Sequence, residues 1–171
     1  ETVSGLGAFE KAVPSSLKTI AFGSEVFPAR QLALWRKYVP NARYINLYGP
    51  TEATGMSCYY VVDREFKEDE VIPIGRPFPN TGILLLNEDG KEVTQGEKGE
   101  ICIRGTAVTM GYCRQPEKTA GSFVQNPLNK DYPEIIYKTG DLGYYNDRGE
   151  LMFASRKDYQ IKHMGCLLYT S

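Results

Sequence analysis

Apolar runs and turn signals divide the chain into two parts with different patterns. Near the N-terminus, residues 16–22 (SLKTIAF) and 42–47 (ARYINL) are apolar runs of strand length. Between them, Pro28 opens a stretch in which Leu32, Trp35 and Val39 recur at helical spacing. A strand, a helix and a second strand at this spacing predict a βαβ unit, and hence two parallel strands.

After Gly55 the pattern changes to short strands separated by polar and Pro-rich turns. Two apolar-rich runs around residues 146–149 (NDRG) predict a hairpin over 142–153, and only residues 116–123 suggest a helix in this half. The fold class predicted is therefore α/β plus β: the end of an α/β parallel-sheet subdomain over residues 1–55, then a small antiparallel β-barrel subdomain over 56–157. Four further runs read as strands: MSCYYVV, GILLLN, GEICIRG and EIIYKTG.

Composition narrows the class of protein without identifying a function. The 171 residues are 42% hydrophobic, and 20 Lys and Arg against 21 Asp and Glu leave a net charge of -1, so no basic excess points to nucleic acid. The four cysteines form no C-x-x-C pair, which argues against zinc and favours free thiols in a reducing compartment. No apolar run is long enough to span a bilayer, so we expect a cytoplasmic protein with no membrane partner.

The stretch from 43 to 55 (RYINLYGPTEATG) places functional side chains directly after a predicted parallel strand. Ligands of open α/β sheets bind at the carboxyl ends of such strands. Tyr48 offers a ring for stacking, Gly49 lets a ligand approach the backbone, and Thr51 offers a hydroxyl to a phosphate. Glu52 offers a hard oxygen to Mg²⁺. A plain Gly-Pro turn with an exposed Glu explains the same residues equally well.

Two later stretches also allow either a ligand-binding role or a purely structural one. In 137–142 (YKTGDL), Asp141 could accept hydrogen bonds from a ribose diol, because a carboxylate carries only acceptors, or it could simply cap a turn. In 155–163 (SRKDYQIKH), Arg156 could bond a ribose or phosphate oxygen, or belong to a solvated charged strand. His163, the single histidine, has no nearby nucleophile in the sequence and is interpreted as a surface residue.

The order of four stretches is far more specific than any one of them. NLYGPTE, GEICIRGTAVTMGY, YKTGDL and SRKDYQIKHMG, in this order, resemble the adenylate-forming (AMP-binding) enzyme superfamily. The resemblance runs from about Leu17 to Gly165 and is greatest to amino-acid adenylation domains of nonribosomal peptide synthetases and to D-alanine–carrier protein ligases. Members activate a carboxylate with ATP to give an acyl-adenylate and pyrophosphate, and a carrier-protein thiol then takes the acyl group.

The resemblance implies a role for each site residue. Asn46 and Tyr48 would contact adenine, Thr51 the phosphate and Glu52 the Mg²⁺, which makes Thr51 and Glu52 the catalytic pair. Asp141 and Arg156 would bind the ribose. Asp158 would be the hinge that opens a C-terminal domain, of which residues 158–171 would be the start. The cofactors implied are ATP (or AMP), Mg²⁺ and a phosphopantetheine on the partner carrier protein.

The same carry-over implies a substrate pocket without charge. Its members in this chain would be Ile20, Phe22, Leu47, Gly55 and Met56. Because a buried charge without a partner is costly, we expect a small neutral amino acid as substrate.

Departures from the family pattern suggest an interior fragment. The family's Gly/Ser/Thr-rich phosphate loop and the catalytic Lys of its C-terminal domain are not in this sequence, so we expect the isolated chain to be inactive. Ser155 replaces the usual Gly, and residues 166–171 depart abruptly from the family, so we expect them to be poorly ordered. The alternatives are an acyl- or aryl-CoA ligase of the same superfamily, or a catalytically inert nucleotide-binding or structural β module.

Overall fold

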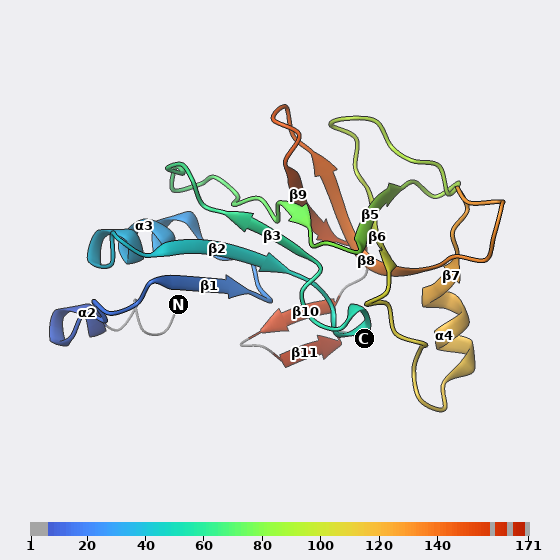
Figure 1. The fold of residues 1–171 in the computed structure, drawn as a ribbon, viewed down its shortest axis with the longest axis horizontal. Coiled ribbons are helices and arrows are strands. Elements are labelled where there is room, and N and C mark those ends of the chain that lie inside the picture. The colour runs from blue at the N-terminus through green and yellow to red at the C-terminus, as the bar shows by residue number, and fades with distance from the viewer. Residues whose placement is uncertain (1–6, 158–159, 164–165, 170–171) are drawn as a thin grey trace.

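Two larger sheets share a core, and a separate pair of short strands lies near the C-terminus (Figure 1). The computed structural model describes residues 7–157, 160–163 and 166–169. No helix in these ranges combines the length and the hydropathy that a membrane span requires.

The first sheet begins with the predicted βαβ unit. Strand β1 (Thr19–Gly23), helix α3 (Ala29–Tyr38) and strand β2 (Arg43–Tyr48) follow one another, and β1 pairs with β2 in parallel, with Ile20 opposite Tyr44. Pro28 stands at the N-cap of α3. Leu32, on the buried face of this helix, packs in one cluster with Tyr44 of β2. The helical spacing and the parallel pair are thus confirmed.

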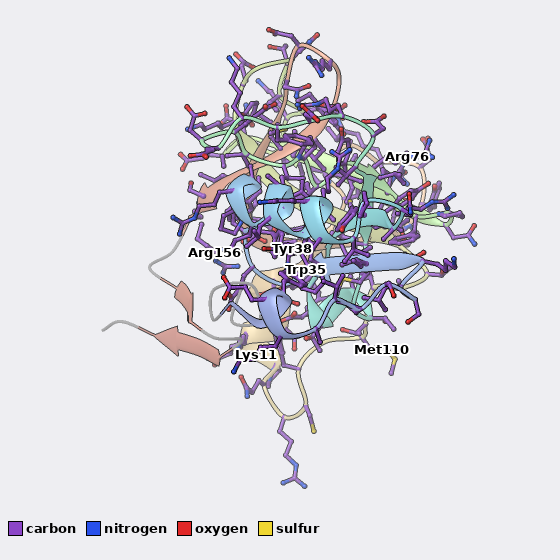
Figure 2. The ribbon with its side chains drawn as sticks, turned by 90° about the vertical axis from the view of Figure 1, so that its left-hand side faces the viewer. Lys11, Trp35, Tyr38, Arg76, Met110 and Arg156 are labelled. Atoms are coloured by element: carbon purple, nitrogen blue, oxygen red, sulfur yellow. The ribbon has the colours of Figure 1, made fainter. Side chains whose placement is uncertain are left out.

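A short N-terminal helix, α2 (Ala8–Lys11), is held against α3 by aromatic side chains. Phe9 stacks on Tyr38 with ring centroids 4.8 Å apart and meets Trp35 edge to face at 4.7 Å. Figure 2 shows this end of the molecule, with Trp35 and Tyr38 labelled beside the two helices. The packing of these rings anchors α2, which at four residues is too short to persist alone.

The first sheet continues beyond residue 55. Strand β3 (Cys58–Val61) pairs antiparallel with β2, and the short β4 (Arg76–Pro77) pairs with β3, so the order is β1-β2-β3-β4. The change of sheet therefore falls between β4 and β5, after the position where the apolar pattern changes. A mixed sheet results, with its parallel pair at the β1 side.

The second sheet is antiparallel and curls around β8, as the fold class predicted. Its order is β5-β6-β8-β7, and β9 also pairs with β8. Register shifts in β6 and β8 mark the bulges that let strands bend. The elements are β5 (Thr81–Leu86), β6 (Gly99–Gly105), α4 (Pro116–Ser122), β7 (Phe123–Gln125), β8 (Ile135–Tyr145) and β9 (Leu151–Arg156).

One hydrophobic cluster joins the two sheets. Cys58 of the first sheet packs with Leu85, Ile101 and Leu151 of the second, and all are almost fully buried. The segment before β4 reinforces this contact, because the Ile74 amide donates to the Leu151 carbonyl at 2.9 Å. The shared core fixes how the end of β2 faces β8 and β9.

The described C-terminal residues form a pair of short strands. Cys166–Tyr169 form β11, which pairs antiparallel with β10 (Gln160–His163) through a register of four residue pairs. This pairing was not predicted from the sequence, and the expectation that residues 166–171 are poorly ordered stays a prediction. The hinge residue expected at Asp158 lies outside the described residues.

The shared core yields a test of stability. Ile101 is fully buried and Ile135 is 49% exposed, so the pair separates burial from residue type. Ile101→Ala should lower the free energy of unfolding by about 2–5 kcal/mol, since it removes buried methyl groups and leaves a cavity. Ile135→Ala should change it by about 0.5 kcal/mol or less. Urea unfolding of both variants, followed by circular dichroism, checks this, and equal losses would contradict the assignment of the core.

A candidate nucleotide-binding site where the two sheets meet

The tight turn after β2 forms one wall of the site. Pro50 is extended, Thr51–Ala53 form the 3-10 helix η1, and Thr54 and Gly55 take positive φ angles of 58° and 94°. The Ser57 amide closes the turn on the Tyr48 carbonyl at 2.7 Å. A Cβ on Gly49 would lie 2.0 Å from the Gly55 carbonyl oxygen, so only glycine permits this turn. The turn presents Thr51 exposed and Glu52 partly exposed.

A buried carboxylate forms the centre of the site. Asp141 on β8 is only 8% exposed, and both of its carboxylate oxygens are engaged. The Tyr48 hydroxyl donates to Oδ2 at 2.6 Å, and the Arg156 guanidinium donates to Oδ1 at 2.8 Å. Arg156 stands opposite Asp141 in the β8–β9 register and also donates to the Thr139 carbonyl at 3.1 Å. A buried charge needs such partners, because without them its desolvation is not compensated.

The backbone beneath Asp141 is held as firmly as its side chain. The Thr139 hydroxyl donates to the Ile101 carbonyl at 2.7 Å and accepts from the Asp141 amide at 3.0 Å. One residue away, the Glu100 carboxylate accepts from the Gly140 amide at 3.1 Å. The same carboxylate pairs with Lys138 at 3.5 Å and Lys157 at 3.9 Å. The Glu100 carboxylate therefore lies between two cationic side chains, next to the buried pair of Asp141 and Arg156.

Burial and neighbouring charge keep the site tyrosines protonated. Loss of solvent raises the pKa of Tyr48 well above its ordinary value, and the negative charge of Asp141 raises it further. Burial likewise raises the pKa of Tyr112 and of Tyr137, and Glu52 adds to both shifts. Each hydroxyl is thus available as a hydrogen-bond donor across the physiological pH range.

These groups face a cleft of about 750 Å³ between the two sheets. All seven residues predicted to hold the nucleotide and its metal line it: Asn46, Tyr48, Gly49, Thr51, Glu52, Asp141 and Arg156. They come from β2, the Gly49 link that follows it, η1, β8 and β9, and Arg156 is labelled in Figure 2. Asn46 is buried, and its amide donates to the Pro73 carbonyl at 2.8 Å.

The five residues predicted for the substrate pocket do not line this cleft. Ile20 and Phe22 pack against the core beneath α3, and Met56 is 40% exposed. Leu47 lies on β2 and Gly55 in the turn after η1. Phe22 nevertheless stacks on Phe27, which does line the cleft, with ring centroids 4.3 Å apart. Their role in substrate binding stays a prediction.

Several cleft residues were not singled out as candidates from the sequence. Tyr112 follows β6, and its hydroxyl donates to Glu52 Oε1 at 2.7 Å across 60 residues of chain. Tyr137, Glu100 and Lys118 also line the cleft. Tyr112 and Tyr137 do fall within the stretches that carry the family resemblance, which was the one clue that pointed to them.

Comparison with known proteins agrees with this geometry. Residues 3–113 match the family described as AMP-binding enzyme, which is well over half of the chain. The chain belongs to the AMP-binding enzyme family.

Among curated AMP-binding relatives, the chain is 39% identical over 144 residues to a D-alanine–D-alanyl carrier protein ligase of Streptococcus pyogenes serotype M3. It is 38% identical over 151 residues to bacitracin synthase 1 of Bacillus licheniformis. These alignments cover 84% and 88% of the chain but only 27% and 3% of the two relatives. The chain thus spans a minor part of the AMP-binding proteins that it matches.

A solved structure shows the same AMP-binding fold. PA1221, described as an NRPS protein containing adenylation and PCP domains, superposes with a TM-score of 0.86 at 31% identity. The superposition covers 98% of this chain and 33% of that one. The mixed sheet and the curled antiparallel sheet are therefore those of an adenylation domain.

The buried tyrosine yields a prediction for alkaline pH. Because the pKa of Tyr48 is higher in the folded protein than its ordinary value of 10.0, folding favours the protonated hydroxyl. Its contribution to stability is complete below pH 10 and is lost as the pH rises towards the folded pKa. Between pH 10 and 11, Tyr48→Phe should therefore lose less stability than the wild type, by up to about 1.4 kcal/mol. Urea unfolding of both proteins at pH 10 and pH 11 checks this. An equal loss of unfolding free energy in the two proteins would contradict it.

Proposed function

We propose that this chain supplies the nucleotide-binding centre of an ATP-dependent ligase that forms an aminoacyl-adenylate. The observation that carries the proposal is the Asp141 carboxylate, oriented by Tyr48 and Arg156 inside a cleft at the carboxyl end of a parallel strand. In open α/β sheets this is where nucleotides bind. Membership of the AMP-binding family supports the same conclusion.

Asp141 and Arg156 suit the ribose of ATP. A carboxylate held by two donors still offers lone pairs, so Asp141 can accept hydrogen bonds from vicinal hydroxyls. Arg156 is one-quarter exposed and contributes further donors at the same place. Asn46 and Tyr48 lie beside them on β2 and would contact the adenine.

Glu52 and Thr51 suit the phosphates and their metal. Mg²⁺ is usually held by one or two carboxylates together with phosphate oxygens, so a single Glu facing the cleft fits this ion. Bound Mg²⁺ would neutralise charge on the phosphates during transfer. Thr51 is exposed at the same turn and can donate its hydroxyl to a phosphate oxygen.

In the proposed reaction, the substrate carboxylate attacks the α-phosphorus of ATP. A new oxygen–phosphorus bond forms and the bond to pyrophosphate breaks, giving the acyl-adenylate. A phosphopantetheine thiol on a carrier protein then takes the acyl group and releases AMP. Support for this second step comes from the carrier protein named in the streptococcal ligase and from the PCP domain of PA1221.

A panel of carboxylic acids tests the reaction and its substrate class. The experiment is ATP–pyrophosphate exchange by the full-length protein that carries this segment, with neutral amino acids, charged amino acids, fatty acids and aryl acids. The uncharged residues carried over for the pocket lead us to expect exchange with small neutral amino acids such as alanine. A charged side chain would be buried without a partner. Exchange driven by Asp, Glu, Lys or Arg would refute the substrate class, and exchange with fatty or aryl acids alone would favour a CoA ligase.

Glu52→Gln tests the metal role in the same full-length protein. The substitution keeps the shape of the side chain and removes its charge. We expect exchange to fall by roughly 10²-fold or more, as for loss of one preorganised electrostatic group. Glu25→Gln, at an exposed carboxylate that lines the same cleft, is the matched control and should retain most of the activity. A rate for Glu52→Gln within a few-fold of wild type would rule out the metal role.

A further inference from the structure

The loop between β6 and α4, residues 106–115, is attached to the turn that carries Glu52. The Thr109 amide donates to the Glu52 carbonyl at 2.9 Å, and the Thr54 hydroxyl donates to the Ala107 carbonyl at 2.7 Å. The third contact is the hydrogen bond from the Tyr112 hydroxyl to Glu52 Oε1 at 2.7 Å. The first joins the two backbones, the second joins the Thr54 side chain to the backbone of the loop, and only the third reaches the Glu52 carboxylate.

The ring of Tyr112 is itself fixed on several sides. It packs edge to face on Phe123 with centroids 5.6 Å apart, and the Lys118 ammonium lies 4.3 Å from its centroid. Its amide donates to the Thr119 hydroxyl at 2.9 Å. Next to it, Gly111 has a φ of 126°, and a Cβ there would lie 2.3 Å from the Thr119 side chain. The hydroxyl of Tyr112 therefore occupies a fixed point.

This arrangement holds the Glu52 carboxylate in place at the wall of the cleft. Oε1 accepts from Tyr112, and the Tyr137 side chain also interacts with this carboxylate. A glutamate side chain that must be ordered at the moment of binding loses rotamer entropy, whereas one already held does not. Groups that orient a ligating carboxylate commonly change metal affinity or activity by 10–100-fold when they are removed.

We infer that Tyr112 is a positioning residue that presents the Glu52 carboxylate to the magnesium–phosphate group of ATP. The inference rests on the proposed function, since it assumes that Glu52 faces the metal. In this role Tyr112 acts on the metal through the Glu52 carboxylate that it orients.

Binding without turnover separates this role from a general effect on the reaction. Isothermal titration calorimetry of the full-length protein with ATP, in the absence of amino acid, gives the affinity with and without Mg²⁺. The ratio of the two affinities is the magnesium enhancement. In Tyr112→Phe, which keeps the ring and removes only the hydroxyl, the enhancement should fall roughly 10-fold. Affinity for ATP without Mg²⁺ should change less than about 2-fold.

Thr54→Val is the matched control. It removes the other side-chain hydrogen bond between the turn and the loop while leaving the Tyr112–Glu52 contact intact. Its magnesium enhancement should match the wild type. If Thr54→Val and Tyr112→Phe lose the enhancement equally, attachment of the loop rather than the hydroxyl is responsible, and the inference is overturned. Thermal unfolding of both variants should stay within a few degrees of the wild type.

A double variant distinguishes failure of the inference from failure of the proposed function. In the Glu52→Gln background, adding Tyr112→Phe should reduce the enhancement less than about 2-fold further, since residues that act together are not additive. Independent multiplication of the two losses, or full enhancement in Tyr112→Phe alone, would overturn the positioning role while leaving Glu52 in place. Full enhancement in Glu52→Gln would overturn the metal role itself, and the positioning role with it.

Discussion

The pairing of the Asp141 carboxylate is the interaction on which this structure most depends. Asp141 belongs to the curled sheet and Tyr48 to the mixed sheet, and their hydrogen bond of 2.6 Å crosses from one to the other. Arg156 completes the pairing from β9. A carboxylate this buried destabilises a fold unless it is paired, so the end of β2 and the β8–β9 hairpin must meet. The cleft lies where these two parts of the fold meet.

The orientation of Glu52 also depends on a contact between residues that are far apart in the sequence. The turn that carries Glu52 is closed by its own backbone hydrogen bonds, but the carboxylate is oriented by Tyr112, from the loop that follows β6 of the curled sheet. The two carboxylates of the site are thus held by two tyrosines, Tyr48 for Asp141 and Tyr112 for Glu52. In both cases burial keeps the phenol protonated and able to donate. A site of this kind is largely formed before its ligand arrives, which reduces the entropy lost on binding.

The local elements could be predicted because their signals are local. Pro28 with the spacing of Leu32 and Trp35 indicated α3, and the apolar runs on either side indicated β1 and β2. The turn around Asn146 likewise indicated the β8–β9 hairpin. Which strands pair was harder to predict. Strand β3 follows the change of pattern at Gly55 but joins β2, because a strand can pair with any neighbour of matching register. The β10–β11 pair was missed for the same reason.

The sequence by itself determined the residue types of the site and, through the order of its motifs, the family. It placed Asn46, Tyr48, Thr51, Glu52, Asp141 and Arg156 as candidates, and all of them line one cleft. Only the tertiary structure decided which groups orient them. Glu52 and Tyr112 lie 60 residues apart, and Tyr48 and Asp141 lie 93 apart. Periodicity and turn chemistry act over a few residues, whereas these contacts follow from how two sheets share one core, and that is set by packing throughout the chain.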